Sequence, residues 1–394
     1  GCDGGAIGRR TPPGTSRAAG AGASCDAVSI AVEIEQGPGR GATLAHAPGK
    51  LFVAGEYGVV EAGQSAVLVA VDRRLTFTAR PAAKPQVLEG KGWAYVAAAR
   101  AVLDELAQAH GRPRPPFSVR TLSDLEDFDL DGSGPRKYGL GSSAAVTAAA
   151  VVALDAWHGL GLGPEEVLRA ALLATLRVNP RASGADVATC LVGGWAAYCS
   201  PDRSWLREQV GEDLGEGIDP RTTARLVATP WPGLEARRLP TPSFRVLVGW
   251  SGRPASTMSL VAAVRASGSL PQWFVDESTR CARALADAVV RDDYSAASEA
   301  VTATRENLLA LSQTAGVAIE TPVLRELVEA AHGLGLSAKS SGAGGGDCGI
   351  ALVPSGRMSA IYVDELARLL VALAGDRGAS IGQVYEPDDG KPTG

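Results

Sequence analysis

The stretch from Lys137 to Val146 reads K-Y-G-L-G-S-S-A-A-V. Gly139 and Gly141 let the backbone turn tightly and come close to a ligand, because glycine has no Cβ. Ser142 or Ser143 is typical of a helix cap, and the first N–H groups of the helix that follows form an anion site with the helix dipole. The stretch therefore predicts a phosphate-binding loop. It is not a Walker A loop, because no G-K-[ST] follows four residues after the first glycine.

Two further glycine-bearing segments lie far from this loop in the chain. The first, Ala47 to Tyr57, reads A-P-G-K-L-F-V-A-G-E-Y, and the second, Lys339 to Gly349, reads K-S-S-G-A-G-G-G-D-C-G. Lys50 is either a surface lysine at a strand start or a cation beside a transferring phosphoryl group. Four glycines within Gly342 to Gly346 suit a place where backbone approaches a ligand better than the interior of a helix or strand.

The three segments, in this order and well separated, resemble the three signature motifs of the GHMP kinases. That family includes galactokinase, homoserine kinase, mevalonate kinase and phosphomevalonate kinase. The mixture of strands and helices without strict alternation favours an α+β fold. The resemblance implies a two-domain GHMP kinase fold, with an N-terminal ribosomal-protein-S5-like domain, a C-terminal ferredoxin-like domain, and an ATP site at the domain interface.

Other segments indicate a subfamily. The run from Trp250 to Thr257 resembles the W-[ST]-G-x-x-A-S-T segment of bacterial-type phosphomevalonate kinases, and the runs 305–308 and 319–322 match the same group. The resemblance covers roughly residues 44 to 375 and implies transfer of the γ-phosphoryl group of ATP to phosphomevalonate. The alternatives are mevalonate kinase or another GHMP small-molecule kinase, and a non-catalytic sensor of the same fold.

The resemblance also assigns roles to residues. Asp186 lies in R-A-S-G-A-D-V-A, which resembles the family's S-G-x-D-x-A segment. It is either an N-cap carboxylate or the group that orients or deprotonates the attacking oxygen. The expected catalytic residues are Lys50 and Asp186, and the expected nucleotide-binding residues are Lys137, Gly139, Leu140, Gly141, Ser142, Ser143 and Ala144.

For the acceptor, the resemblance and the basic residues together give a wider set of candidates. These are Lys91, Arg181, Ser183, Arg253, Ser341, Gly342, Ala343 and Gly344, with Lys137 and Lys339 as further cations; which of them reach the acceptor phosphate stays open. Asp347 is expected to support the third loop. Mg²⁺ is expected on Ser142 or Ser143, because residues 171–179 lack the acidic residue that mevalonate kinases carry there.

Composition sets the remaining bounds. The chain has 394 residues, which predicts two domains, and a net charge of −5, which gives no reason to expect nucleic-acid binding. No apolar run reaches membrane-spanning length, and the six cysteines are scattered, so we expect a cytoplasmic enzyme with free thiols, as a monomer or homodimer. The expected domains are a disordered tail over 1–42, an N-terminal domain over 43–225 and a C-terminal domain over 240–390.

Hydrophobic periodicity and turn residues predict the elements along the chain. Residues 122–135 and 200–240 are expected to be irregular. The expected strands are 50–54, 66–70, 75–79, 116–121, 195–198, 244–250 and 350–353. The expected helices are 93–109, 143–158, 164–177, 186–190, 276–290, 294–312, 321–333 and 359–373.

Overall fold

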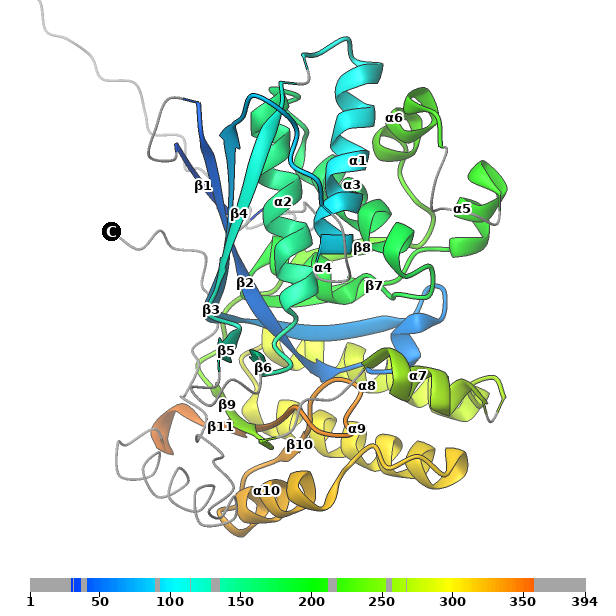
Figure 1. Cartoon of the computed structure of the whole chain (residues 1–394). Helices are drawn as coiled ribbons and strands as arrows, with labels where there is room; N and C mark the ends of the chain where they lie inside the picture. Colours follow the sequence, from blue (N-terminus) through cyan, green and yellow to red (C-terminus); the bar gives the residue numbers. More distant parts are fainter. Residues whose placement is uncertain are drawn as a thin grey trace, which may run out of the picture.

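The computed structural model describes residues 30, 32–36, 41–88, 93–113, 115–128, 135–211, 218–252, 257–266 and 268–357 (Figure 1). Most of the expected tail and the expected helix over 359–373 lie outside these residues. The described chain forms two units, one above the other in Figure 1, each with its own antiparallel sheet and its own helices.

The upper unit is built on a six-stranded sheet. Its strand order is β1-β2-β3-β7-β8, with β4 also paired to β3. The strands are β1 (Glu33–Gln36), β2 (Thr43–Ala54), β3 (Ser65–Pro81), β4 (Phe117–Ser123), β7 (Trp195–Cys199) and β8 (Glu235–Arg238). A short hairpin pairs β5 (Glu126–Phe128), inside the expected loop over 122–135, with β6 (Pro135–Lys137), which begins at its last residue.

The central strand β3 is a single element of 17 residues, and the expectation of two separate strands over 66–70 and 75–79 was wrong. The polar run Asp72-Arg73-Arg74 suggested a break, but the strand continues through it. It remains extended because β2 pairs along its length, while β7 pairs with its first part and β4 with its last. The pairing with β2 shifts register at this run, because Pro48 pairs with Arg74 and Gly49 with Val71, so the extra residues of the irregularity lie in β3.

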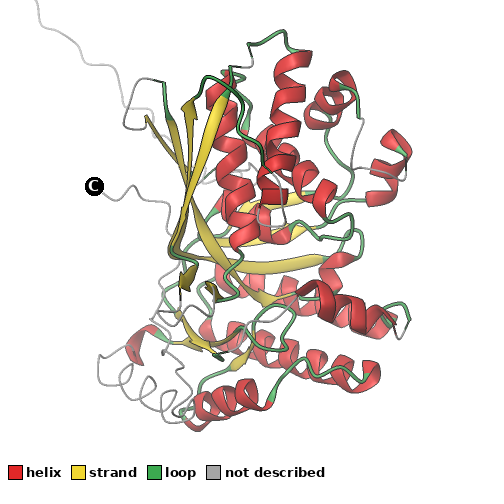
Figure 2. Cartoon of the chain, viewed as in Figure 1, coloured by secondary structure: helices red, strands yellow, loops and turns green. Residues whose placement is uncertain are grey.

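Helices cover one face of this sheet, as Figure 2 shows in red against yellow strands. They are α1 (Ala94–Ala109), α2 (Ser142–His158), α3 (Pro164–Val178) and α4 (Ala185–Val192). Helix α2 packs on β2 and β3 through fully buried alanines, whose small side chains allow a close approach to the strands. Helix α3 begins at Pro164, and the Glu166 carboxylate accepts from the amide of the N-cap residue Gly163.

Residues 200–240 are not irregular, so that expectation was also wrong. They contain α5 (Arg203–Val210), α6 (Pro220–Ala228) and strand β8. Both helices have an aspartate N-cap, Asp202 and Asp219, whose side chains accept backbone amides of the first turn. The helices are short and polar, and the prolines around them suggested loops instead.

The lower unit has a three-stranded sheet in the order β10-β11-β9. Its strands are β9 (Arg245–Trp250), β10 (Ala338–Ser340) and β11 (Cys348–Val353), and its helices are α7 (Thr257–Ala266), α8 (Gln272–Val290), α9 (Tyr294–Ala315) and α10 (Pro322–Gly333). Two 3₁₀ turns, η1 (Gly58–Val60) and η3 (Ser355–Arg357), complete the described elements. Helix α8 also packs on β3 and η1, so the hydrophobic core continues from one unit into the other.

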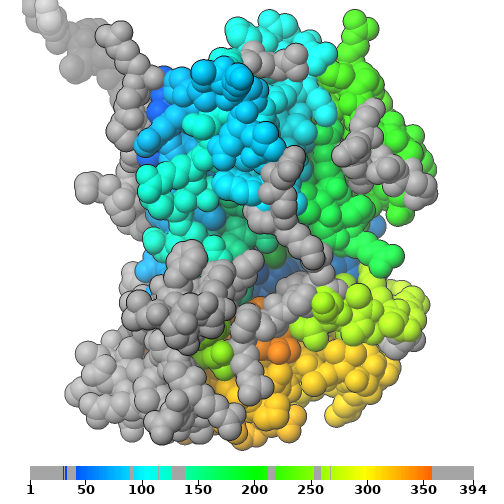
Figure 3. All heavy atoms as spheres, in the orientation of Figure 1, coloured from blue at the N-terminus to red at the C-terminus, as the bar shows by residue number. Residues whose placement is uncertain are grey.

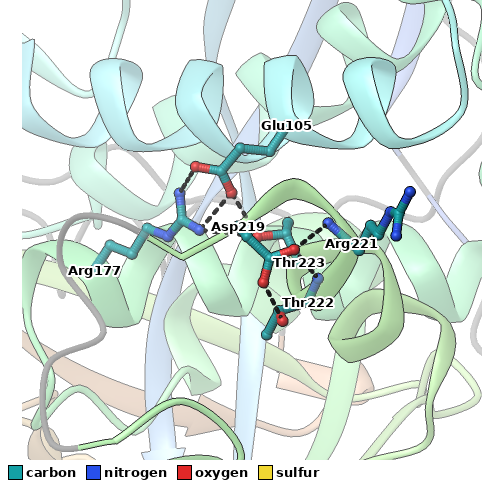
Figure 4. Close-up of polar contacts among 6 residues, drawn as sticks. All are labelled: Glu105, Arg177, Asp219, Arg221, Thr222 and Thr223. Carbon is teal, nitrogen blue, oxygen red and sulfur yellow. Dashed lines mark hydrogen bonds and ion pairs between the residues drawn. The ribbon is translucent and has the colours of Figure 1, made fainter.

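A polar cluster joins three helices of the upper unit far from the glycine segments (Figure 4). Arg177 of α3 donates to both carboxylate oxygens of Glu105 in α1, at 2.9 and 2.7 Å. The hydroxyl of Thr223 in α6 donates to the same carboxylate at 2.5 Å. The Arg177 side chain is only 5% exposed, so this two-pronged ion pair lies in a poorly hydrated place.

We predict that Arg177→Met destabilises the protein by about 2 kcal/mol, because it leaves a half-buried carboxylate without its cation. Urea unfolding followed by circular dichroism measures this loss. The matched control is Arg280→Met, which breaks an exposed pair with Glu277 within one helix and should cost less than about 1 kcal/mol. Equal losses in the two variants would contradict the importance of the Glu105 cluster.

Candidate active site

The predicted phosphate loop leads into α2 as expected, but neither serine caps the helix. Gly141 is the N-cap residue, with a φ of 82°, and no side-chain cap bond forms. The first helical bond runs from the Ala145 amide to the Gly141 carbonyl. The preceding amides of Ser142, Ser143 and Ala144 thus stay outside the helical ladder, where they and the helix dipole favour an anion.

Lys50 lies directly beside this loop. Its main-chain amide donates to the Leu140 carbonyl at 2.9 Å, although the two residues belong to different glycine segments. The approach is close enough to exclude side chains. A methyl group on Gly49 would lie 2.9 Å from the Leu140 oxygen, and one on Gly141 would lie 2.7 Å from Cε of Lys50. These two glycines therefore allow the lysine stem to lie against the loop.

The Lys50 ammonium faces Asp186. Its Nζ lies 3.6 Å from Oδ2 of Asp186, and the lysine side chain is 8% exposed against 40% for the aspartate. Asp186 is the second residue of α4, and the N-cap is Gly184, so the N-cap interpretation of this aspartate was wrong. Oδ1 of Asp186 is buried and has no hydrogen-bond partner within the described part of the chain.

The third glycine segment is attached to the first across the junction of the two units. Lys339 is completely buried and forms an ion pair with Glu56. The Ser341 hydroxyl donates to the Phe52 carbonyl at 2.9 Å, and the Tyr57 hydroxyl donates to the Ala343 carbonyl at 2.6 Å. In the space-filling view the orange part of the chain lies at this junction (Figure 3).

Burial lowers the pKa of Lys339, while the neighbouring Glu56 carboxylate acts in the opposite direction. A lysine with no exposed surface and a carboxylate partner joins the two units rather than presenting its charge to an acceptor. The expectation that Lys339 is a cation for the acceptor phosphate is therefore not supported by its position.

Asp347 contacts the phosphate loop from the lower unit. It adopts a φ of 54°, unusual for a residue with a side chain, and its carbonyl accepts from the Ser251 amide at 2.8 Å. A methyl group on Gly139 would lie 2.4 Å from Cγ of Asp347. The aspartate thus packs on Gly139, which agrees with the expected supporting role.

The runs 305–308 and 319–322, which indicated a subfamily, contact the third glycine segment. Arg305 donates to both carboxylate oxygens of Glu320, at 2.7 and 2.9 Å. The adjacent Ile319 carbonyl accepts from the Gly345 amide at 2.7 Å, and a methyl group on Gly344 would lie 2.1 Å from that oxygen. The 305–308 and 319–322 runs therefore act together, although 15 residues separate the paired side chains.

Some of the remaining candidates for acceptor binding lie among the described residues, and others lie outside them. Arg181 and Ser183 lie in the loop before α4, where Arg181 is exposed and the Ser183 hydroxyl accepts from the Ala185 amide at 3.3 Å. Gly342 faces open space. Lys91, Arg253 and the side chain of Lys137 lie outside the described residues.

Within the described part of the chain, no group of three histidine, cysteine, aspartate or glutamate side chains forms a metal site. The four cysteines described there, Cys190, Cys199, Cys281 and Cys348, are free, as expected. None of the described helices combines the length and apolar content needed to cross a bilayer.

Comparison with known proteins agrees with this arrangement. Residues 95–194 match the GHMP kinases N terminal domain, and residues 285–363 match the GHMP kinases C terminal domain. Over 357 residues the chain is 39% identical to the phosphomevalonate kinase of Streptomyces sp. (strain CL190), covering 80% of this chain and 91% of the relative. The chain belongs to the GHMP kinase family.

Solved structures share the fold. The Streptococcus pneumoniae phosphomevalonate kinase in complex with phosphomevalonate and AMPPNP superposes with a TM-score of 0.73 at 25% identity, over 87% of this chain and 99% of that one. The Lin0012 protein of Listeria innocua superposes with a TM-score of 0.78 at 29% identity, over 88% and 98%. The two-domain α+β GHMP kinase fold expected from the three glycine segments is confirmed.

We predict that Lys339→Met destabilises this GHMP kinase by about 3–5 kcal/mol, because it leaves the Glu56 carboxylate buried and unpaired. Replacing both partners, in Glu56→Leu/Lys339→Met, should recover much of the loss, since no buried charge then remains. Chemical denaturation of the three proteins measures the difference. A double variant less stable than Lys339→Met would show that the ion pair itself is needed.

Proposed function

We propose that this chain is a phosphomevalonate kinase, which transfers the γ-phosphoryl group of ATP to the phosphate of (R)-5-phosphomevalonate and gives (R)-5-diphosphomevalonate and ADP. The observation that carries the proposal is the meeting of Lys50, Asp186 and the N-terminus of α2 at one place. The extensive identity with a phosphomevalonate kinase, and the paired segments that hold the third loop, support this acceptor.

In this proposal the phosphate loop binds the nucleotide. The free amides at the start of α2 donate hydrogen bonds to phosphate oxygens, and the glycines at 139 and 141 let the backbone approach them. Lys50 offsets the negative charge on the transferring phosphoryl group, because its ammonium lies beside the same loop. Its low exposure strengthens that electrostatic interaction.

The acceptor makes a strong base unnecessary. A phosphate monoester has a second pKa of about 6, so at neutral pH the acceptor phosphate already carries an ionised oxygen that can attack. That oxygen attacks the γ-phosphorus, the bond from the γ-phosphorus to the β–γ bridging oxygen breaks, and ADP leaves. Asp186 then orients the acceptor rather than taking a proton from it. Arg181, with Lys91 and Arg253, stays a candidate for binding the acceptor phosphate.

Mg²⁺ belongs to this proposal because ATP-dependent phosphoryl transfer commonly uses it. The described residues fit a magnesium ion held mainly by nucleotide phosphates and water. Neither serine hydroxyl caps α2, and among the described residues no group of three histidine, cysteine, aspartate or glutamate side chains competes for the metal. The ion would neutralise charge between the β- and γ-phosphates.

Two alternatives to this function are a mevalonate kinase and a non-catalytic sensor. Mevalonate kinases also align with this chain, at lower identity, such as 32% over 166 residues for the enzyme of Aeropyrum pernix. A non-catalytic sensor is disfavoured because the Lys50–Asp186 pair and the loop amides are all present and adjacent. A mevalonate kinase would turn over mevalonate, whereas a sensor would turn over neither acceptor.

The deciding experiment is an ADP-release assay with Mg-ATP that offers (R)-5-phosphomevalonate and (R)-mevalonate in parallel. Turnover only with the phosphorylated acceptor is the expected result. Turnover with mevalonate would replace the proposed acceptor but keep the site. A folded protein that binds ATP and turns over neither acceptor would favour the sensor.

We further predict that Lys50→Met lowers kcat by about 10²- to 10³-fold, as expected for loss of a group that stabilises the transition state. Asp186→Asn should lower kcat by only about 10-fold, below the 10²- to 10⁴-fold typical of a lost general base. Asp219→Asn, at the exposed cap of α6, is the matched control and should leave kcat unchanged. Complete loss of turnover in folded Asp186→Asn would show that the aspartate acts as a base.

A further inference from the structure

The loop before Asp186 is held from outside by two side chains that no motif identifies. Arg203 Nη1 donates to the Ala182 carbonyl at 2.8 Å and to the Arg181 carbonyl at 3.3 Å. The Tyr198 hydroxyl donates to the Ser183 carbonyl at 2.7 Å. The carbonyls of residues 181–183 thus all accept side-chain hydrogen bonds, immediately before Gly184, the N-cap residue of α4.

Both side chains come from well-anchored elements. Tyr198 lies in the sheet strand β7 and is 2% exposed. Arg203 is the first residue of α5, whose N-cap Asp202 accepts from the Ser204 amide and donates its own amide to the Pro232 carbonyl at 2.7 Å. Burial raises the pKa of Tyr198, so its hydroxyl keeps its proton and remains a donor at neutral pH.

The position of Asp186 depends on this backbone. Its carboxylate forms no described hydrogen bond, because the Lys50 ammonium lies 3.6 Å away and Oδ1 has no partner in the described chain. Gly184 joins this loop to α4 and is tightly packed. Its φ is 86°, and a methyl group there would lie 2.2 Å from the Leu172 side chain and 2.8 Å from the Tyr198 hydroxyl.

We propose that Arg203 and Tyr198 are positioning residues for phosphoryl transfer, which set the orientation of Asp186 by holding the carbonyls of residues 181–183. This inference rests on the proposed function, since it assumes that Asp186 orients the acceptor. It assigns a role to the end of β7 and the start of α5, which lie outside the three glycine segments and the S-G-x-D-x-A segment.

The test begins with Arg203→Met, Arg203→Lys and Tyr198→Phe in the ADP-release assay. Arg203→Met should lower kcat by about 10- to 100-fold, the cost of misplacing a reacting group by about 1 Å, with KM for ATP nearly unchanged. Arg203→Lys retains one donor and should recover part of the rate. Tyr198→Phe keeps the ring packing and should lose less than Arg203→Met.

Arg169→Met is the matched control. Arg169 is another arginine of the upper unit whose side chain donates to a main-chain carbonyl, here from Nε to the Val227 carbonyl at 2.5 Å. It holds α3 to α6 and not the Asp186 loop. Arg169→Met should lower the melting temperature and leave kcat of the folded enzyme unchanged, which separates positioning from general stability.

A double-mutant cycle gives the decisive readout. If Arg203 acts through Asp186, Arg203→Met should change kcat by less than about 2-fold in the Asp186→Asn background, because interacting residues are non-additive. An equal loss in both backgrounds, or wild-type kcat in both Arg203→Met and Tyr198→Phe, overturns the inference alone. A wild-type enzyme without turnover of phosphomevalonate overturns the proposed function and this inference together.

Discussion

The contact on which the site depends is the close approach of β2 to the phosphate loop, where the Lys50 amide donates to the Leu140 carbonyl. Glycines at 49 and 141 permit it, because any side chain at either position would meet the partner backbone or the lysine stem. The register between β2 and β3 shifts at the same point. One backbone contact thereby brings a cation from the first segment to the anion site of the second. The helix dipole and the ammonium then act on the same volume.

A second constraint completes the site across the two units. Glu56 lies two residues after the end of β2, the strand that contains Lys50, so its buried pair with Lys339 attaches the third glycine segment close to that strand. Such a pair is an uncertain source of net stability, because desolvation opposes the attraction between the charges. Its geometric consequence is clearer. A buried charge tolerates few partners, so the Lys339–Glu56 pair favours one relative placement of the two loops, which Ser341 and Tyr57 reinforce.

The sequence predicted those parts of the site that local chemistry determines. Glycine runs, the lysine after Pro48-Gly49 and the apolar period of α2 each act over a few residues, and all three segments meet as expected. The wrong or missed predictions concern residues whose partners are distant in the chain. The polar run at 72–74 suggested a break because the pairing of β3 with three strands is invisible locally. The Arg203 bonds to carbonyls about 21 residues earlier leave no pattern, since a carbonyl acceptor belongs to every residue.

The nature of the acceptor explains why backbone, and not side-chain hydrogen bonds, suffices to place Asp186. A general base must contact the proton that it removes, and its pKa must be tuned by close partners. In the proposed reaction the acceptor phosphate is already ionised, so Asp186 needs a fixed position near Lys50, whose Nζ lies 3.6 Å from Oδ2, and not a tuned pKa. A carboxylate without hydrogen-bond partners keeps its oxygens free to interact with the acceptor. The rigidity that such bonds would have given must then come from the main chain, through Gly184 and the three carbonyls held by Arg203 and Tyr198.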